Sequence, residues 1–215
     1  MKKLINENLH NNTVVVFTSD NGPWLPFDTH GGSAGPLRDG KGTTWEGGQR
    51  VPGLFWGGTI KKGTISDLGS TMDLFPTLLD FAGIKIPNDR IIDGISLKNT
   101  LINHEPHKRK SILFYREREI YAVRLNEYKA HFITEGAYDY GVSKYYDAKD
   151  YIKKNQKKIL KKPLLFNLNE DVSEKYNIAE DYPEIIDKIK YMIENHRRNL
   201  NAPPDLLSNR TSQEF

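Results

Sequence analysis

The sequence changes from apolar to polar within a few residues, because TVVVFT (Thr13–Thr18) is followed directly by SDNGP (Ser19–Pro23). A short run so rich in Val indicates a β-strand that is buried on both faces. In open α/β sheets, ligands bind at the carboxyl ends of the strands, where Asp20 and Asn21 lie. A carboxylate and an amide carbonyl are hard oxygen donors of the kind that Ca²⁺ or Mg²⁺ binds. The same residues also form ordinary turns, so this stretch alone leaves a metal site and a turn as alternatives.

The elements that follow this stretch continue an α/β pattern. Glycines recur from Gly31 to Gly48, over a stretch too long for a simple connection and typical of a functional loop. Residues 51–56 predict a second strand. Apolar residues at helical spacing predict a helix over 70–82, with Gly83 as its C-terminal cap. Asp73 fits the N-cap of this helix better than a metal site.

The second half of the sequence predicts an antiparallel sheet and a final helix. Short runs separated by turn formers indicate a meander and one added strand, over 111–115, 120–125, 128–134 and 164–168. Pro183 suits the first turn of the last helix. We predict the apolar stripe of that helix from Ile185, Ile189, Met192, Ile193 and Leu200. His196 lies beside the stripe and fits a packed histidine better than a ligand.

Composition excludes several classes of protein. The 31 basic and 28 acidic side chains give a net charge of +3, which is too balanced to indicate a nucleic-acid partner. No apolar run approaches the ~20 residues of a membrane helix, so no membrane association is predicted. The sequence has no Cys, which excludes disulfides, thiolate metal sites and a cysteine-derived nucleophile within it. The start Met-Lys-Lys lacks the apolar region of a signal peptide, so the compartment stays open.

Six lysines stand between Tyr151 and Lys162. A basic stretch of this kind suits an anionic glycan, nucleic acid or a lipid surface. A solvated insertion between strands is the simpler interpretation, and it is the one that we expect.

Several motifs occur together in a fixed order along the chain. They are FTSDNGP (17–23), GGSAGPLR (31–38), GKGTTWEGGQRVP (40–52), MDLFPTL (72–78), IDG (92–94), YKAHF (128–132) and PLLFNL (163–168). Together they closely resemble the arylsulfatase family, in the branch of arylsulfatase A and N-acetylgalactosamine-6-sulfatase. The resemblance covers roughly residues 12–200 and is far more specific than any single motif.

The resemblance implies a role for particular residues. Asp20 and Asn21 match the Asp-Asn pair that completes the calcium site of the family, and Lys41 matches the lysine that contacts the substrate sulfate. Trp24 and His30 lie between the matched motifs, where the leaving group of a substrate could reach them. An aromatic face and an imidazole suit a sugar or aryl ring, and loop packing is the alternative for both.

Other features of the family have no counterpart in this sequence. The family nucleophile is a formylglycine made from Cys or Ser in a Cys/Ser-x-Pro-x-Arg motif, and no such motif occurs. The paired Asp-Asp that supplies further calcium ligands is also missing. The turn usually written Asp-Pro-Gly-Glu is DVSE (Asp171–Glu174). In the Gly-rich loop, we expect Glu46 and Arg50 to hold the shape of the loop through a charged hydrogen bond.

The resemblance therefore implies a partial architecture. We expect residues 1–105 to form part of an alkaline-phosphatase-like (sulfatase) α/β domain. We expect residues 106–200 to form a small α+β subdomain, with an antiparallel sheet and a terminal helix, and residues 201–215 to form a flexible tail.

The implied function is that of a sulfuric-ester hydrolase acting on a sulfated sugar or an aryl sulfate. This chain would supply calcium- and sulfate-binding residues, lack the formylglycine nucleophile, be inactive alone, and pair with an N-terminal sulfatase half. The family suggests a periplasmic, extracellular or lysosomal setting. Two alternatives stay open: a non-catalytic remnant that binds anionic glycans, and a phosphoesterase on the same fold.

Overall fold

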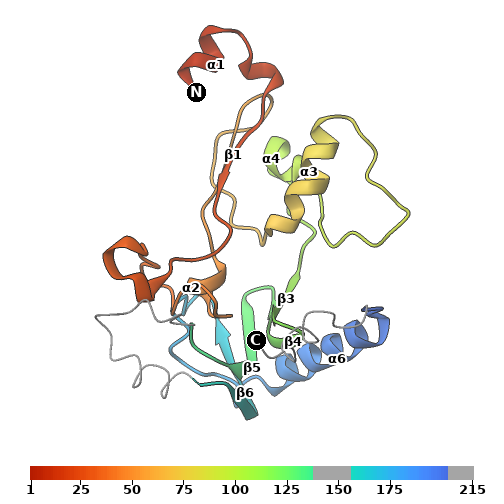
Figure 1. Ribbon diagram of the computed structural model, residues 1–215. Coiled ribbons are helices and arrows are strands. Elements are labelled where there is room, and N and C mark those ends of the chain that lie inside the picture. Colours follow the sequence, from red (N-terminus) through yellow and green to blue (C-terminus); the bar gives the residue numbers. More distant parts are fainter. Residues whose placement is uncertain (138–155, 203–215) are drawn as a thin grey trace, which may run out of the picture.

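The computed structural model describes residues 1–137 and 156–202. In this part of the chain there are two sheets, one of two strands and one of four, and both are antiparallel (Figure 1). The first 105 residues also contain helices α1 (Lys2–Asn6), α2 (Glu46–Gln49), α3 (Leu74–Phe81) and α4 (Lys98–Asn103), and the short 3-10 helices η1 (His10–Asn12), η2 (Leu25–His30) and η3 (Thr71–Asp73). The tail predicted over 201–215 lies almost wholly outside the described residues.

The strands of the small sheet, β1 (Val15–Thr18) and β2 (Gly53–Trp56), form where the sequence predicts them. They pair antiparallel, with Phe17 opposite Leu54, so the expectation of an open α/β sheet with ligands at its carboxyl edge does not describe this ribbon. The prediction of burial on both faces is wrong, because Phe17 and Leu54 are each 62% exposed. No third strand joins the ribbon among the described residues, and a two-stranded ribbon has little to cover its faces.

The helix predicted over 70–82 is present as η3 followed by α3, and Gly83 ends it as expected. Gly83 has φ +69°, a backbone conformation that favours glycine at a helix C-terminus. Asp73 is fully buried, and its carboxylate accepts the amide of Ser70 in a capping box. The N-cap of this box is Ser70 and not Asp73, and Asp73 forms no side-chain cap where α3 begins, so the capping role was predicted but not its position. The sequence analysis missed that the Asp73 carboxylate also pairs with Arg109.

The meander predicted in the second half is confirmed. Its strands run in the order β3 (Ser111–Arg116), β4 (Glu119–Leu125), β5 (Tyr128–Thr134) and β6 (Lys158–Asn167). Strand β6 begins at Lys158 rather than Leu164, so the later lysines of the basic stretch lie in a strand and not in an insertion. Lys153 and Lys154 lie outside the described residues.

The lysines at the start of β6 lie on the edge of the sheet. Lys157 and Lys162 form ion pairs with Glu119 and Glu180, which removes part of the positive charge. Exposed lysines on an edge strand also discourage pairing with other chains. The solvated interpretation of this stretch therefore fits the residues that are described.

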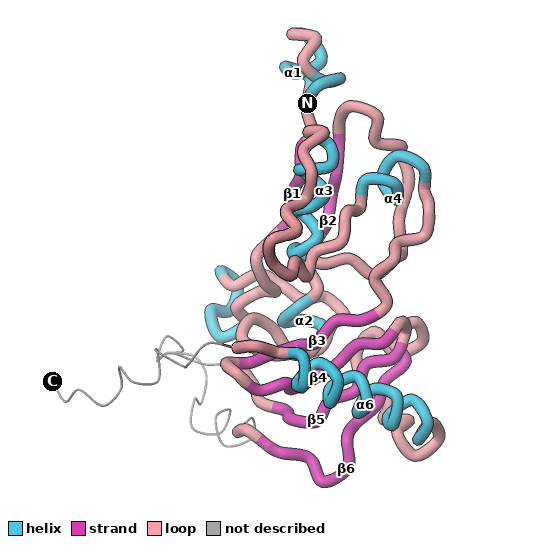
Figure 2. Tube along the Cα trace, turned by 90° about the vertical axis from the view of Figure 1, so that its right-hand side faces the viewer, coloured by secondary structure: helices cyan, strands magenta, loops and turns pink. Residues whose placement is uncertain are grey.

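The final helix α6 (Pro183–Asn199) lies across the four-stranded sheet (Figure 2). Pro183 stands in its first turn as predicted. The core between helix and sheet is made by Ile120, Val123, Ala130, Leu165, Ile186, Ile189 and Ile193. The apolar stripe was predicted in part: Ile186 was missed, and Leu200 lies beyond the helix end and is 50% exposed.

His196 of α6 packs against β3, as expected for a histidine at the edge of a packed helix. Its Nε2 lies 2.6 Å from the hydroxyl of Tyr115.

Among the described helices, none combines the length and the apolar character that crossing a membrane would require.

Candidate functional site

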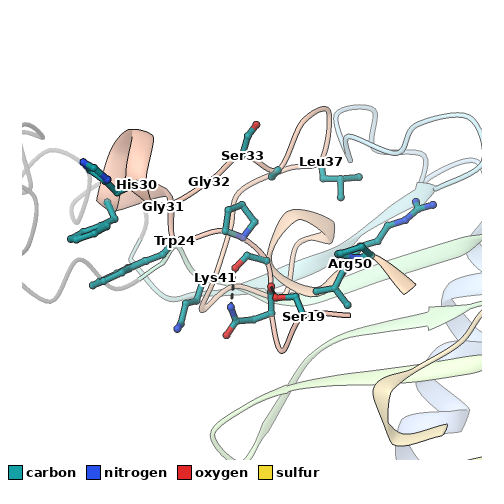
Figure 3. Close-up of a pocket in the computed structure, with 16 residues that line it drawn as sticks. Ser19, Trp24, His30, Gly31, Gly32, Ser33, Leu37, Lys41 and Arg50 are labelled. Carbon is teal, nitrogen blue, oxygen red and sulfur yellow. Dashed lines mark hydrogen bonds between the residues drawn. The ribbon is translucent and has the colours of Figure 1, made fainter. Parts of the chain in front are cut away.

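An open pocket of about 720 Å³ lies beyond the end of β1, between the turn that follows this strand and the Gly-rich loop. Its walls include Asn21, Trp24, His30, Lys41 and Arg50. Trp24, His30 and Lys41 gather at one end of the pocket and Arg50 lies toward the other (Figure 3).

The structure brings four of the five predicted site residues into this pocket. Asn21, Trp24, His30 and Lys41 all line it, although Lys41 is distant from the others in the sequence. Asp20 does not line the pocket; it stands beside Asn21 with an exposed side chain. The structure therefore shows where these residues lie, and their roles stay predictions.

The oxygen donors fit calcium in kind but not in number. Calcium takes six to eight oxygens, commonly from carboxylates and amide carbonyls. The side-chain Nδ2 of Asn21 donates to the carbonyl oxygen of Gly22 at 2.9 Å, so the side-chain Oδ1 of Asn21 is not used in this bond. In residues 1–137 and 156–202, no group of three or more Asp, Glu and His side chains is suited to hold a metal. As calcium ligands, Asp20 and Asn21 would supply only two side chains of the oxygen shell that this ion takes.

Backbone contacts fix Lys41 against the turn that carries Asn21. The amide of Lys41 donates to the carbonyl oxygen of Pro23 at 2.8 Å, and the amide of Gly22 donates to the carbonyl oxygen of Gly48 at 3.0 Å. A Cβ on Gly22 would lie 1.7 Å from the carbonyl oxygen of Gly47. Such an approach is open only to a glycine at position 22.

Three aromatic side chains form one wall of the pocket. The rings of Trp24 and Phe27 stack with centroids 5.2 Å apart, and the imidazole of His30 meets Phe27 edge-on at 6.0 Å. Phe27 is 43% exposed and was missed by the sequence analysis, although it stands between the two aromatic residues that were selected. The wall offers ring faces and an imidazole to a ligand held beside Lys41.

Behind the pocket, a buried cluster of charged groups joins the Gly-rich loop to β5. The ammonium of Lys129 donates to Glu46 Oε1 at 2.8 Å and lies 3.4 Å from Glu174 Oε1. Glu174 Oε1 also contacts His131 Nε2 at 2.7 Å. The predicted charged hydrogen bond of Glu46 and Arg50 is wrong, because Glu46 is buried and pairs with Lys129, whereas Arg50 is exposed at the pocket.

The protonation states in this cluster follow from burial and neighbouring charge. Burial lowers the pKa of His131 to about 4, and the positive charge of Lys129 adds to this effect. Burial alone would raise the pKa of Glu174, but the bond from His131 and the charge of Lys129 outweigh it and hold the pKa below its usual range. At neutral pH, His131 is therefore neutral and donates its Nε2 proton to an ionised Glu174.

The architecture is that of sulfatases of known structure. A sulfatase from Pseudoalteromonas sp. (PsFucS1) superposes on 93% of this chain with a TM-score of 0.71 and 28% identity, and 40% of that protein is covered.

Two family models match the chain, one described as "Sulfatase" over residues 1–84 and one as "C-terminal region of aryl-sulfatase" over residues 107–214. Arylsulfatase A of Bos taurus is 40% identical over 181 residues, which are 80% of this chain and 34% of the relative. N-acetylgalactosamine-6-sulfatase of Mus musculus is 35% identical over 212 residues, which are 92% of this chain and 40% of the relative. The chain belongs to the sulfatase family, and it spans between a third and two fifths of the length of these relatives.

Proposed function

We propose that this chain supplies one wall of the active site of a sulfuric-ester hydrolase. In this proposal Asp20 and Asn21 are calcium ligands and Lys41 contacts the sulfate group of the substrate. The observation that carries the proposal is that Asn21 and Lys41 line the same open pocket. A lysine that was only a solvated part of the loop would have no reason to lie beside Asn21.

The chemistry of these residues suits sulfate-ester cleavage. A bound calcium ion would polarise a sulfate oxygen as a Lewis acid. The ammonium of Lys41, whose backbone is held in place by Pro23, would stabilise the negative charge that builds up as the S–O bond breaks. Because the sequence has no Cys and no Ser-x-Pro-x-Arg motif, the formylglycine nucleophile would come from outside these residues.

We also propose that Trp24 and His30 contact the alcohol part of the substrate. Both lie at the Lys41 end of the pocket (Figure 3). A ring held by its sulfate at Lys41 would lie against the indole face of Trp24, with His30 within reach of its hydroxyl groups. A sulfated sugar or an aryl sulfate fits this arrangement.

The proposed partner is an N-terminal sulfatase half that completes the site. Apolar side chains exposed on β1, β2, η3 and α3 offer a surface for it: Phe17, Leu54, Met72, Phe75 and Leu78 are between 43% and 62% exposed. A contiguous exposed apolar patch marks an interaction surface, and the proposal is that these side chains belong to one. In this proposal residues 1–105 belong to the catalytic domain of the family, and residues 106–200 form its C-terminal subdomain.

The test is co-expression of this chain with a formylglycine-bearing N-terminal sulfatase half. We expect turnover of an aryl sulfate in the complex and none by the chain alone. Lys41→Ala should lower kcat by a factor of a hundred or more, roughly 3–4 kcal/mol of charge stabilisation at a preorganised site. The control Lys62→Ala, which removes an exposed lysine away from the pocket, should leave turnover unchanged.

Two results would contradict the proposal. A Lys41→Ala complex that turns over at the wild-type rate would exclude the sulfate contact. An aryl phosphate that is cleaved in preference to the aryl sulfate would favour the phosphoesterase alternative, since the two anions share a tetrahedral shape.

A further inference from the structure

The α2 turn is hydrogen-bonded to both chain segments that bring Asn21 and Lys41 to the pocket. Its residue Gly48 accepts the amide of Gly22, next to Asn21, at 3.0 Å. Its residue Gln49 donates to the carbonyl oxygen of Thr43 at 2.6 Å, and the hydroxyl of Thr43 donates to the carbonyl oxygen of Gly40 at 2.9 Å. The segment that carries Lys41 and the segment that carries Asn21 are therefore both bonded to α2.

Strand β5 and the 171–174 turn hold α2 in place. Glu174 Oε2 accepts the amide of Glu46, the first residue of α2, at 2.6 Å, and Lys129 from β5 bonds to the side chain of Glu46. Glu46, Lys129 and Glu174 are at most 2% exposed. These contacts join residues that are separated by 83 and 128 positions in the sequence.

A second set of contacts holds the start of the same loop. Arg38 donates to the carbonyl oxygen of Glu174 at 2.8 Å, and its guanidinium lies 3.6 Å from the ring centre of Trp45. The hydroxyl of Ser173 donates to the carbonyl oxygen of Pro36 at 2.6 Å. Together with the bond from the Glu46 amide to Glu174, these contacts hold the loop before and after Lys41.

We propose that Lys129 and Glu174 are positioning residues that set the place of Lys41 relative to Asn21. A buried ion pair is a weak source of stability, because desolvation offsets most of its attraction, and an apolar pair of similar size would serve stability as well. The charged cluster instead supplies directional contacts. Glu174 accepts a hydrogen bond from the amide of Glu46, the first residue of α2, and Lys129 fixes the side chain of Glu46. The proposed positioning of the loop depends only on these contacts, whereas its expected effect on sulfate binding rests on the proposed function.

The experiment measures loop order and anion binding in the 215-residue chain. Glu174→Gln keeps the size of the side chain and removes its charge, and Lys129→Met removes the ammonium. The control is Asp73→Asn, which removes the charge of Asp73 in its buried ion pair with Arg109, outside the loop. Amide hydrogen exchange is followed at Gly22 and over residues 40–48, with thermal unfolding measured in parallel, and calorimetry with inorganic sulfate gives the anion affinity.

We expect exchange in Gly22 and residues 40–48 to become roughly tenfold faster in Glu174→Gln and Lys129→Met, with β3–β4 amides changing less. The control should lower the unfolding temperature without this local effect. Sulfate affinity should fall roughly tenfold or more in the two variants, because small displacements of a binding group weaken its contact sharply.

Exchange that rises evenly over the whole chain, or equally in Asp73→Asn, would overturn the proposal and leave the cluster a structural one. If the wild-type chain binds no sulfate, the proposed role of Lys41 fails, while the exchange pattern still decides whether Lys129 and Glu174 position the loop. If Lys129→Met does not fold, Glu174→Gln alone decides.

Discussion

The buried imidazole of His131 should make the chain less stable in mild acid. Burial lowers the pKa of His131 from 6.5 to about 4, so in this range the unfolded chain takes up a proton that the folded chain does not. The stabilising effect of the neutral ring is complete above about pH 6.5 and is lost as the pH falls toward about 4. At about pH 5 the loss from this group is about 2 kcal/mol, and at about pH 4 it is about 3 kcal/mol.

The assay is urea unfolding at about pH 7.5 and about pH 5. Because the lowered pKa of Glu174 acts in the same direction, wild-type chain alone would not isolate the histidine. His131→Gln keeps a donor for Glu174 and removes the titration, so the drop in unfolding free energy between the two pH values should shrink by about 2 kcal/mol. The control Ala130→Gly weakens the same buried strand and should keep the wild-type pH dependence.

An unchanged drop in His131→Gln would refute the reasoning, since the imidazole would then carry the proton in the folded chain at about pH 5. A reduced drop in Ala130→Gly as well would show that lower stability, and not the loss of titration, produced the effect.

Further predictions concern the loop, the cation and the second buried ion pair. Gly22→Ala places a Cβ 1.7 Å from a carbonyl oxygen and should lower the unfolding free energy by roughly 3 kcal/mol. The control Gly69→Ala has open space around the new methyl group and should leave the unfolding free energy nearly unchanged. Equal losses in the two variants would contradict the close contact at Gly22. Calorimetry should find calcium binding only near the millimolar range, lost in Asp20→Ala, and micromolar affinity would mean that this chain holds further ligands. Arg109→Met leaves the buried Asp73 carboxylate without its charge partner and should cost roughly 3–5 kcal/mol in urea unfolding; a loss below about 1 kcal/mol would show that the carboxylate is satisfied without Arg109.

The elements that could be predicted from the sequence are those that local pattern decides. The meander follows from short apolar runs between turns, the last helix from Pro183 and its spacing, and the end of α3 from Gly83. The burial of β1 could not be predicted in this way. A Val-rich run shows that a strand forms, but the exposure of Phe17 depends on which other elements pack against the ribbon.

The meeting of Asn21 and Lys41 could be predicted through the order of the motifs, whereas the cluster behind them could not. Glu46, Lys129 and Glu174 lie far apart in the sequence, and each alone reads as a solvated charge. One signal was available: Lys129 and His131 alternate with apolar residues in a predicted strand, so both point to the same face. That face is buried, and a buried lysine requires an acidic partner.

The glycine contacts and the charged cluster have a joint consequence for the pocket. A Cβ at Gly47 would lie 2.1 Å from the carbonyl oxygen of Asp39, and one at Gly48 would lie 2.5 Å from that of Gly40. Backbone segments packed this closely cannot shift independently, so a displacement of α2 moves the Lys41 segment and the Asn21 segment together. The bonds from Glu174 and Lys129 act on α2 itself. A substitution of Glu174 or Lys129 should therefore weaken anion and cation binding together, whereas a substitution in the pocket wall should weaken one of them.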